Sequence, residues 1–182
     1  MTRTLLILVC GAGPAADVGK LVALAHDAHW EVGVTATPGA LPFLDAAALP
    51  PSVSLRSDFK PTSGSARRSL PDPQALIIAP ATYNTVNKLA AGIADNYALV
   101  SAAESIGRGV PTVVVPFVNS ALAARTPFRR SVAALRDEGL YVLFGAHDRW
   151  EPHQPGTGSD RRSVFPWSTA LEVASRQADV RQ

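Results

Sequence analysis

The amino-acid sequence predicts an α/β fold, a single domain with a doubly wound parallel sheet, on three observations. Apolar runs rich in Val, Ile and Leu, typical of strands covered on both faces, alternate with stretches whose apolar residues recur at helical spacing. The first apolar run ends at a Gly-Ala-Gly-Pro turn and leads into a helical stretch and a second strand, which together form a βαβ unit with a right-handed crossover. The length of 182 residues suits one compact unit with its own core.

Hydrophobic periodicity predicts each element in turn. Strands are expected at residues 5–10, 31–37, 53–55, 76–78, 110–115 and 140–144. Helices are expected at residues 15–29, 38–49, 84–107, 126–138 and 168–176. Residues 50–73 are rich in Ser, Pro and Arg and predict a surface excursion, whereas residues 145–166 are rich in Gly, Pro and charge and predict a loop or flap. We therefore assign residues 1–144 to the ligand-binding part and residues 145–182 to a C-terminal loop and terminal helix of the same domain.

Composition and charge argue against several classes of partner and site. No apolar run approaches the roughly 20 residues that cross a bilayer, and the first run, after Arg3, is interrupted by Gly11 and Gly13 with no cleavage pattern behind it. The net charge is only +2 and the arginines are scattered, without interleaved aromatic residues, so no nucleic-acid partner is expected. The lone Cys10 excludes an intrachain disulfide framework and argues against a cysteine-based zinc site. It favours a reducing compartment, so we expect a cytoplasmic protein with no metal and no membrane partner.

Glycine and polar residues follow three of the predicted strands, at the sheet edge where open parallel sheets bind ligands. After the first strand, Gly11 and Gly13 permit close backbone approach to a phosphate, although Ala16 breaks the Gly-x-Gly-x-x-Gly spacing and a tight turn explains them equally well. Residues 79–85 supply hydroxyl and amide groups that can cap a helix or bind phosphate and polyol oxygens. Residues 115–119 place an asparagine beyond a proline, where such a residue is commonly part of a turn.

Two of these segments resemble a known family. The run PATYNT at residues 80–85, followed by NKLAAGIADN at residues 87–96, resembles the FMN-binding core of the homo-oligomeric flavin-containing cysteine decarboxylases. That family includes phosphopantothenoylcysteine decarboxylases and the enzymes that oxidatively decarboxylate the C-terminal cysteines of lantibiotic-type peptides. The run PFVN at residues 116–119 resembles the family's substrate motif, and the resemblance covers roughly residues 4–144. It implies a Rossmann-like flavoprotein fold in which residues 1–144 bind FMN.

The resemblance also implies roles for individual residues. Asn119 would hold the carboxylate of a substrate cysteine. Asp95 and Asn96 would lie near a subunit boundary, because the family builds its flavin site between protomers of a homo-oligomer, a trimer or a multiple of trimers. The flavin would oxidise the cysteine to a thioaldehyde, the electron sink for loss of CO₂. A helix C-terminal turn is the structural alternative for the Asp-Asn pair. The flavin would be lined by Gly11, Gly13, Thr37, Thr82, Asn84, Thr85, Asp95 and Asn96.

The sequence departs from the family at a catalytic position. The family's essential histidine would fall at Ala66, and no histidine lies between Trp30 and Tyr141. A side chain from elsewhere would have to act as the acid or base. The candidates for this role are His147 and His153 in the C-terminal loop, of which we favour His153, and also Arg67 and Arg68.

Two further differences leave the reaction open. The methionine of the substrate motif is replaced by Val118, and the flap cysteine with which phosphopantothenoylcysteine decarboxylases reduce the ene-thiol is missing, because Cys10 is the only cysteine. A standard role in coenzyme A synthesis is therefore not expected. Three functions remain. The first is an FMN-dependent oxidative decarboxylase, and thus a lyase, that acts on a cysteine-containing peptide or small molecule. The second is an FMN-dependent oxidoreductase of another small substrate, and the third is a non-catalytic flavin-binding regulatory subunit.

Overall fold

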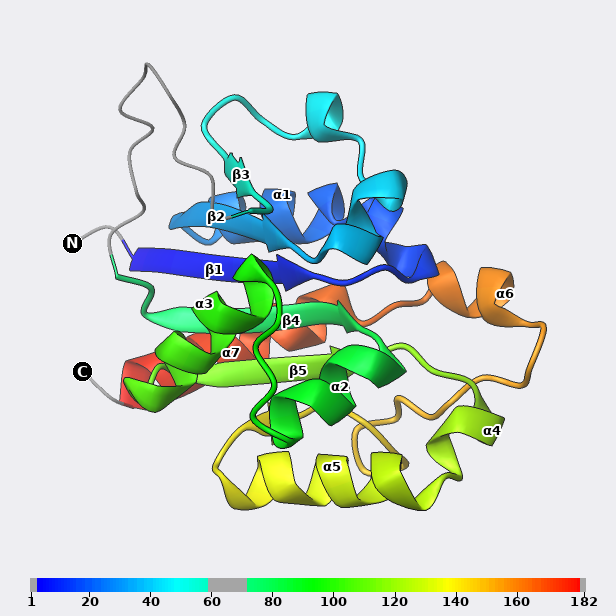
Figure 1. The fold of residues 1–182 in the computed structure, drawn as a ribbon. Coiled ribbons are helices and arrows are strands. Elements are labelled where there is room, and N and C mark those ends of the chain that lie inside the picture. The colour runs from blue at the N-terminus through cyan, green and yellow to red at the C-terminus, as the bar shows by residue number, and fades with distance from the viewer. Residues whose placement is uncertain (1–2, 59–71, 181–182) are drawn as a thin grey trace.

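The computed structural model describes residues 3–58 and 72–180, and within them the chain folds around one parallel sheet. The strand order is β3-β2-β1-β4-β5-β6, and every neighbouring pair runs parallel (Figure 1). The strands are β1 (Arg3–Val9), β2 (Trp30–Ala36), β3 (Ser54–Arg56), β4 (Ala75–Ala81), β5 (Thr112–Pro116) and β6 (Tyr141–Val142). The predicted doubly wound parallel sheet is confirmed, and the order of its strands reverses between β1 and β4.

Helices cover both faces of this sheet (Figure 1). The α-helices are α1 (Gly19–Asp27), α2 (Tyr83–Ala90), α3 (Tyr97–Gly107), α4 (Ser120–Ala123), α5 (Thr126–Asp137), α6 (Gly158–Arg162) and α7 (Trp167–Val180), and the 3₁₀ helices are η1 (Gly13–Asp17), η2 (Pro38–Phe43) and η3 (Ala46–Ala48). Leu5, Ile7 and Val9 of β1 point to one face, where α1 and α7 close a buried cluster, while Leu8 and the following Cys10 point to the other, beneath α2, α3 and α5. Among the described residues, no helix combines the length and the apolar character needed to cross a membrane.

The long helix expected over residues 84–107 is two helices, α2 and α3. Gly92 adopts a φ of 69° just after α2, and the Ile93 N–H reaches back to the Lys88 carbonyl at 2.9 Å, the bonding of a Schellman turn. Asn96 then begins α3, because its Oδ1 accepts a hydrogen bond from the Leu99 N–H at 3.1 Å. The break turns the chain back, so that the polar residues between the two helices lie next to α2.

The helix expected over residues 38–49 is also divided, into the 3₁₀ helices η2 and η3. Pro42 lies inside η2, and a proline ring prevents the regular hydrogen bonding of an α-helix. The last strand is shorter than expected, since only Tyr141–Val142 of the expected residues 140–144 pair with β5.

The C-terminal segment is held against the rest of the domain. Trp150, Phe165 and Trp167 are buried in the cluster that includes α1 and α7, and the Trp150 indole N–H donates to the Pro116 carbonyl at 2.8 Å. Within the loop expected over residues 145–166, the short helix α6 contacts η1. Residues 145–166 therefore pack against the rest of the domain at several points.

Candidate functional site

A cavity of about 440 Å³ opens at the carboxyl ends of β1, β2 and β4. Because the strand order reverses between β1 and β4, the loops that follow these strands run in opposite directions and leave the crevice in which doubly wound sheets bind ligands. The volume falls in the range of small-molecule and cofactor sites. The cavity is lined by Gly11, Thr37, Pro38, Gly39, Thr82, Asn84, Thr85, Lys88, Asp95, Asn96 and Leu99.

The structure gathers the flavin-site residues predicted from the sequence around this cavity, with one exception. Gly13 begins η1, and a Cβ atom on it would lie 3.8 Å from a ring carbon of Phe117 and 3.9 Å from Cδ of Arg162. It therefore faces the C-terminal segment. The sequence did not predict Pro38, Gly39, Lys88 or Leu99, although Lys88 lies four residues after Asn84, on the same helix face.

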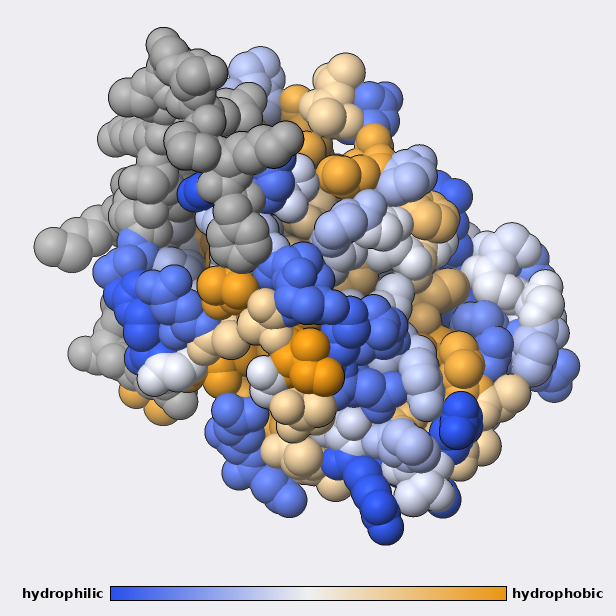
Figure 2. Space-filling view, viewed as in Figure 1, coloured by the Kyte–Doolittle hydropathy of each residue, from blue (hydrophilic) through white to orange (hydrophobic). Residues whose placement is uncertain are grey.

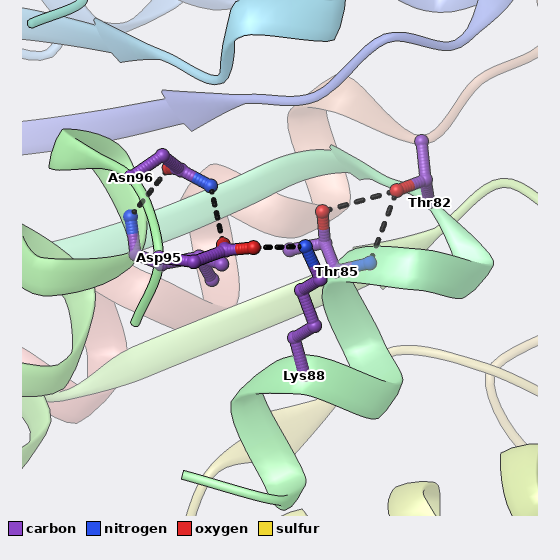
Figure 3. A network of polar contacts seen from close by, with 6 residues as sticks. Thr82, Thr85, Lys88, Asp95 and Asn96 are labelled. Carbon is purple, nitrogen blue, oxygen red and sulfur yellow. Dashed lines mark hydrogen bonds and ion pairs between the residues drawn. The ribbon is translucent and has the colours of Figure 1, made fainter. Parts of the chain in front are cut away.

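The start of α2 gives the cavity a donor-rich wall. Thr82 is the N-cap of the helix: its Oγ1 accepts a hydrogen bond from the Thr85 N–H at 3.2 Å and donates to the Thr85 Oγ1 at 3.0 Å (Figure 3). The first turn of any helix leaves backbone N–H groups without intrahelical acceptors and carries a partial positive charge. Such a terminus, together with hydroxyl and amide side chains, suits an anionic or polyol ligand.

Another part of the cavity wall requires a glycine at position 11. A Cβ atom there would lie only 2.2 Å from the Gly39 carbonyl oxygen, so the β1 loop and the β2 loop pack backbone against backbone. Two further hydrogen bonds hold the loops in place, from the Thr37 N–H to the Val9 carbonyl at 3.0 Å and from the Cys10 N–H to the Pro80 carbonyl at 3.1 Å. The three loops around the cavity therefore form one fixed frame.

An ion pair lies at the rim of the cavity, between α2 and α3. Lys88 Nζ contacts Asp95 Oδ2 at 2.5 Å, and Asn96 Nδ2 donates to Asp95 Oδ1 at 3.1 Å (Figure 3). These contacts, the Lys88 hydrogen bond above all, hold the pKa of the Asp95 carboxyl below its usual range. Since Asn96 caps α3, the Asp-Asn pair begins a helix, and the alternative of a helix C-terminal turn is wrong.

Cys10 lies directly beneath this frame and is fully buried. Burial raises the pKa of its thiol from 9.0 to about 11, in spite of opposing hydrogen bonds with the Thr85 side chain and the Thr82 backbone. The thiol therefore stays protonated at neutral pH and is no thiolate nucleophile.

The two residues predicted to contact or activate a substrate lie next to each other, outside the lining of this cavity. Asn119 and His153 form a parallel bridge, in which the His153 N–H donates to the Val118 carbonyl at 3.3 Å. Asn119 Oδ1 caps α4 by accepting from the Leu122 N–H at 2.9 Å. A second cavity of about 440 Å³ is lined by Glu151, Pro152, His153, Thr157, Asp160, Arg161 and Val164.

His153 contacts the loop after β5 and a residue of its own loop. Its ring lies 4.9 Å from the ring of Phe117, centroid to centroid, and its Nδ1 is 2.9 Å from the Gln154 carbonyl. Arg162 of α6 forms a hydrogen-bonded ion pair with Asp17 of η1. The hydrogen bond from Arg162 is the main reason why the pKa of the Asp17 carboxyl is lowered. Ala66, Arg67 and Arg68 lie outside the described residues.

Comparison with known proteins identifies the family of the chain. A family model described as Flavoprotein matches residues 1–158. The FMN-dependent cysteine decarboxylase TvaF from thioviridamide biosynthesis is 28% identical, with 96% of this chain and 99% of that chain covered and a TM-score of 0.69. No curated protein sequence matches the chain.

Two further solved structures share the fold at lower identity. The FMN-dependent cysteine decarboxylase SpaF is 24% identical over 97% of each chain, with a TM-score of 0.71. A PPC decarboxylase mutant in complex with pantothenoylaminoethenethiol is 23% identical over 90% of this chain and 96% of that chain, with a TM-score of 0.67. The family match covers most of the sequence and confirms the resemblance found in its motifs: the chain belongs to the flavoprotein family.

Proposed function

We propose that this protein binds FMN in the cavity between β1 and β4 and catalyses the oxidative decarboxylation of a cysteine-containing peptide or small molecule. One observation carries the proposal: polar residues of the PATYNT and IADN runs, namely Thr82, Asn84, Thr85, Asp95 and Asn96, line a single cavity at the point where the strand order reverses. The similarity to TvaF, an FMN-dependent cysteine decarboxylase, over nearly the whole of both chains supports the reaction.

The chemistry of the lining residues fits FMN. The hydroxyls of Thr82 and Thr85 and the first-turn N–H groups of α2 suit the phosphate and the ribityl hydroxyls. Gly11 and Gly39 offer backbone without a side chain, so a ligand can approach closely. The buried Leu99 offers an apolar contact to a flat ring. Hydroxyls, free N–H groups and an apolar contact are what a phosphorylated ring cofactor requires.

In the proposed reaction the substrate cysteine loses CO₂ and two hydrogens overall and becomes an enethiol. FMN supplies the two-electron acceptor that this oxidation needs. Asn119 orients the substrate, because its Oδ1 is taken by the Leu122 N–H and its Nδ2 amide is left to donate to the carboxylate. His153 takes up a proton released in the reaction, because an imidazole can act as a base. Its backbone is paired with that of Asn119 and its half-buried ring packs against Phe117, which places it beside the residue that orients the substrate.

We further propose that the functional unit is a homotrimer or a multiple of trimers. Asp95 is exposed at the rim of the cavity, so the described chain leaves this side of the site open. Ile93, two residues earlier, exposes 47% of its surface, and Figure 2 shows hydrophobic atoms in the centre of this face among hydrophilic neighbours. Light scattering on the purified protein tests this: we expect the mass of a trimer or its multiple, and a monomer at micromolar concentration would contradict it.

Anaerobic mixing of the FMN-loaded protein with a peptide that ends in cysteine tests the reaction. We expect bleaching of the flavin absorption and release of CO₂ in equal amounts, and neither with the same peptide ending in serine. Bleaching without CO₂ would instead identify an FMN-dependent oxidoreductase. Bound FMN with neither signal, over a panel of cysteine-terminated peptides and small thiols, would identify a non-catalytic flavin-binding subunit.

A further inference from the structure

One wall of the cavity carries a charge of each sign. Among the described residues that line the cavity, Lys88 is the one cation and Asp95 the one anion, and they form an ion pair. Their side chains are 26% and 50% exposed, so the pair is open to whatever occupies the cavity. An exposed ion pair contributes little to stability, and its position at the cavity points to another role.

Side-chain hydrogen bonds hold the Asp95 carboxylate, and the residues around the pair lie where α2 ends and α3 begins. Asp95 accepts hydrogen bonds on both carboxylate oxygens, from Lys88 and from Asn96, and Asn96 is itself the N-cap of α3 (Figure 3). Lys88 lies in the last turn of α2, where its carbonyl accepts the N–H of Ile93 in the turn that ends the helix. The pair therefore keeps a fixed place on the wall, which is what gives a charge a lasting effect on a bound ligand.

The last turn of α2, not its first turn, carries Lys88. The backbone of Lys88 is four residues beyond that of Asn84, about 6 Å further along the helix axis. The apolar Leu99 lines the same end as the pair and is buried. An apolar side chain beside an ion pair fits the edge of an aromatic ring system better than a phosphate.

We propose, on the basis of the FMN site proposed above, that Lys88 and Asp95 set the reduction potential of the flavin, with opposite sign. Reduction adds electrons to the ring, so a fixed cation beside it favours the reduced form and a fixed carboxylate favours the oxidised form. In the intact pair the two effects oppose each other. Removing one partner leaves the other uncompensated, so the two single variants shift the potential in opposite directions.

The test is a redox titration of the FMN-loaded protein, with the potential read from the flavin spectrum. For Lys88→Met we expect the ratio of affinities for reduced and oxidised FMN to fall at least tenfold, which is about 30 mV for a two-electron couple. For Asp95→Asn we expect a shift of the opposite sign, and for the double variant a return towards the wild-type value. Lys88→Arg keeps the charge and should stay close to wild type.

A matched control is Arg108→Met, which breaks the exposed ion pair of Arg108 with Asp72, neither of which lines the cavity. We expect no shift in its potential. Single variants that shift in the same direction, or not at all, would overturn the inference while leaving the proposed FMN site intact. Failure of the wild type to take up FMN, measured before any reduction, would instead overturn the site itself. A variant that binds more weakly is measured at higher FMN concentration, because the potential depends on the ratio of two affinities.

Discussion

The backbone of His153 lies beside that of Asn119, although the two residues come from opposite sides of α5 in the sequence. The Ser120 N–H donates to the His153 carbonyl at 2.7 Å, and the His153 N–H donates to the Val118 carbonyl at 3.3 Å. The loop after β5 and the C-terminal loop are therefore bonded together. This backbone pairing places a residue with an amide suited to a carboxylate next to a residue with an imidazole suited to a proton.

Replacing Asn119 by aspartate tests its role in substrate binding. Aspartate keeps an oxygen that can cap α4, so the fold should be retained, but it replaces the Nδ2 donor by a negative oxygen that repels a carboxylate. We expect KM for a cysteine-terminated peptide to rise at least about tenfold, or about 1.4 kcal/mol, with an unchanged Kd for FMN. Steady-state kinetics and an FMN titration give the two values. An unchanged KM would show that Asn119 only caps α4.

Replacing His153 separates proton transfer from packing. Phenylalanine preserves a ring packed against Phe117 but cannot carry a proton, whereas glutamine preserves polarity and loses the ring. If His153 is the acid or base, both variants lose about 10²-fold or more in kcat and keep FMN binding. Retention of kcat in His153→Phe, measured as CO₂ release, would assign the residue to packing alone.

The two glycines after β1 should respond differently to alanine. In Gly11→Ala the new Cβ would meet the Gly39 carbonyl at 2.2 Å, so the loop that carries Thr37 must move. We expect a loss of about 1–3 kcal/mol in unfolding free energy and at least tenfold weaker FMN binding. Gly13→Ala meets nothing closer than 3.8 Å and should change stability by less than about 0.5 kcal/mol. Urea denaturation compares the two, and equal effects would contradict the observed packing.

Stability should fall at alkaline pH because of Cys10. The pKa of its thiol is about 11 in the folded protein and 9.0 when exposed, so the unfolded state loses its proton first as pH rises. The contribution of the neutral thiol is fully present below pH 9.0 and is lost as pH rises towards 11. It amounts to two pKa units, on the order of 3 kcal/mol. Unfolding free energies of the wild type and Cys10→Ala should diverge over this range, and parallel curves would contradict the burial of the thiol.

The sequence predicted the sheet because parallel strands carry their signal locally. Runs such as Leu5–Val9 of β1 are apolar on both faces, and each is followed by a helical period. The break between α2 and α3 was missed even though Gly92 and Asn96 are typical helix stop and start residues. Helical periodicity on either side of a short turn hides such a break. The four-residue helix α4 was missed because it is too short to show a period.

The site was less predictable than the sheet, because its details depend on contacts between distant segments. The motif residues Thr82 and Asn96 were found through the family resemblance, and each also caps a helix. The need for Gly11 comes from Gly39, a residue in another loop, so no local pattern shows it. Gly13 faces Phe117 and Arg162 for the same reason, since the C-terminal segment packs on it only in the folded chain.

Titration of the purified protein with FMN tests the central claim most directly. The change in flavin fluorescence reports binding. A parallel titration with riboflavin, which lacks the phosphate, gives the contribution of the phosphate to the affinity. We expect saturation at one FMN per chain, tighter binding of FMN than of riboflavin, and weaker binding of FMN by Thr82→Ala, which loses both the N-cap and a hydroxyl of the cavity. A folded protein that is isolated colourless and takes up no added FMN would contradict the assignment of this cavity.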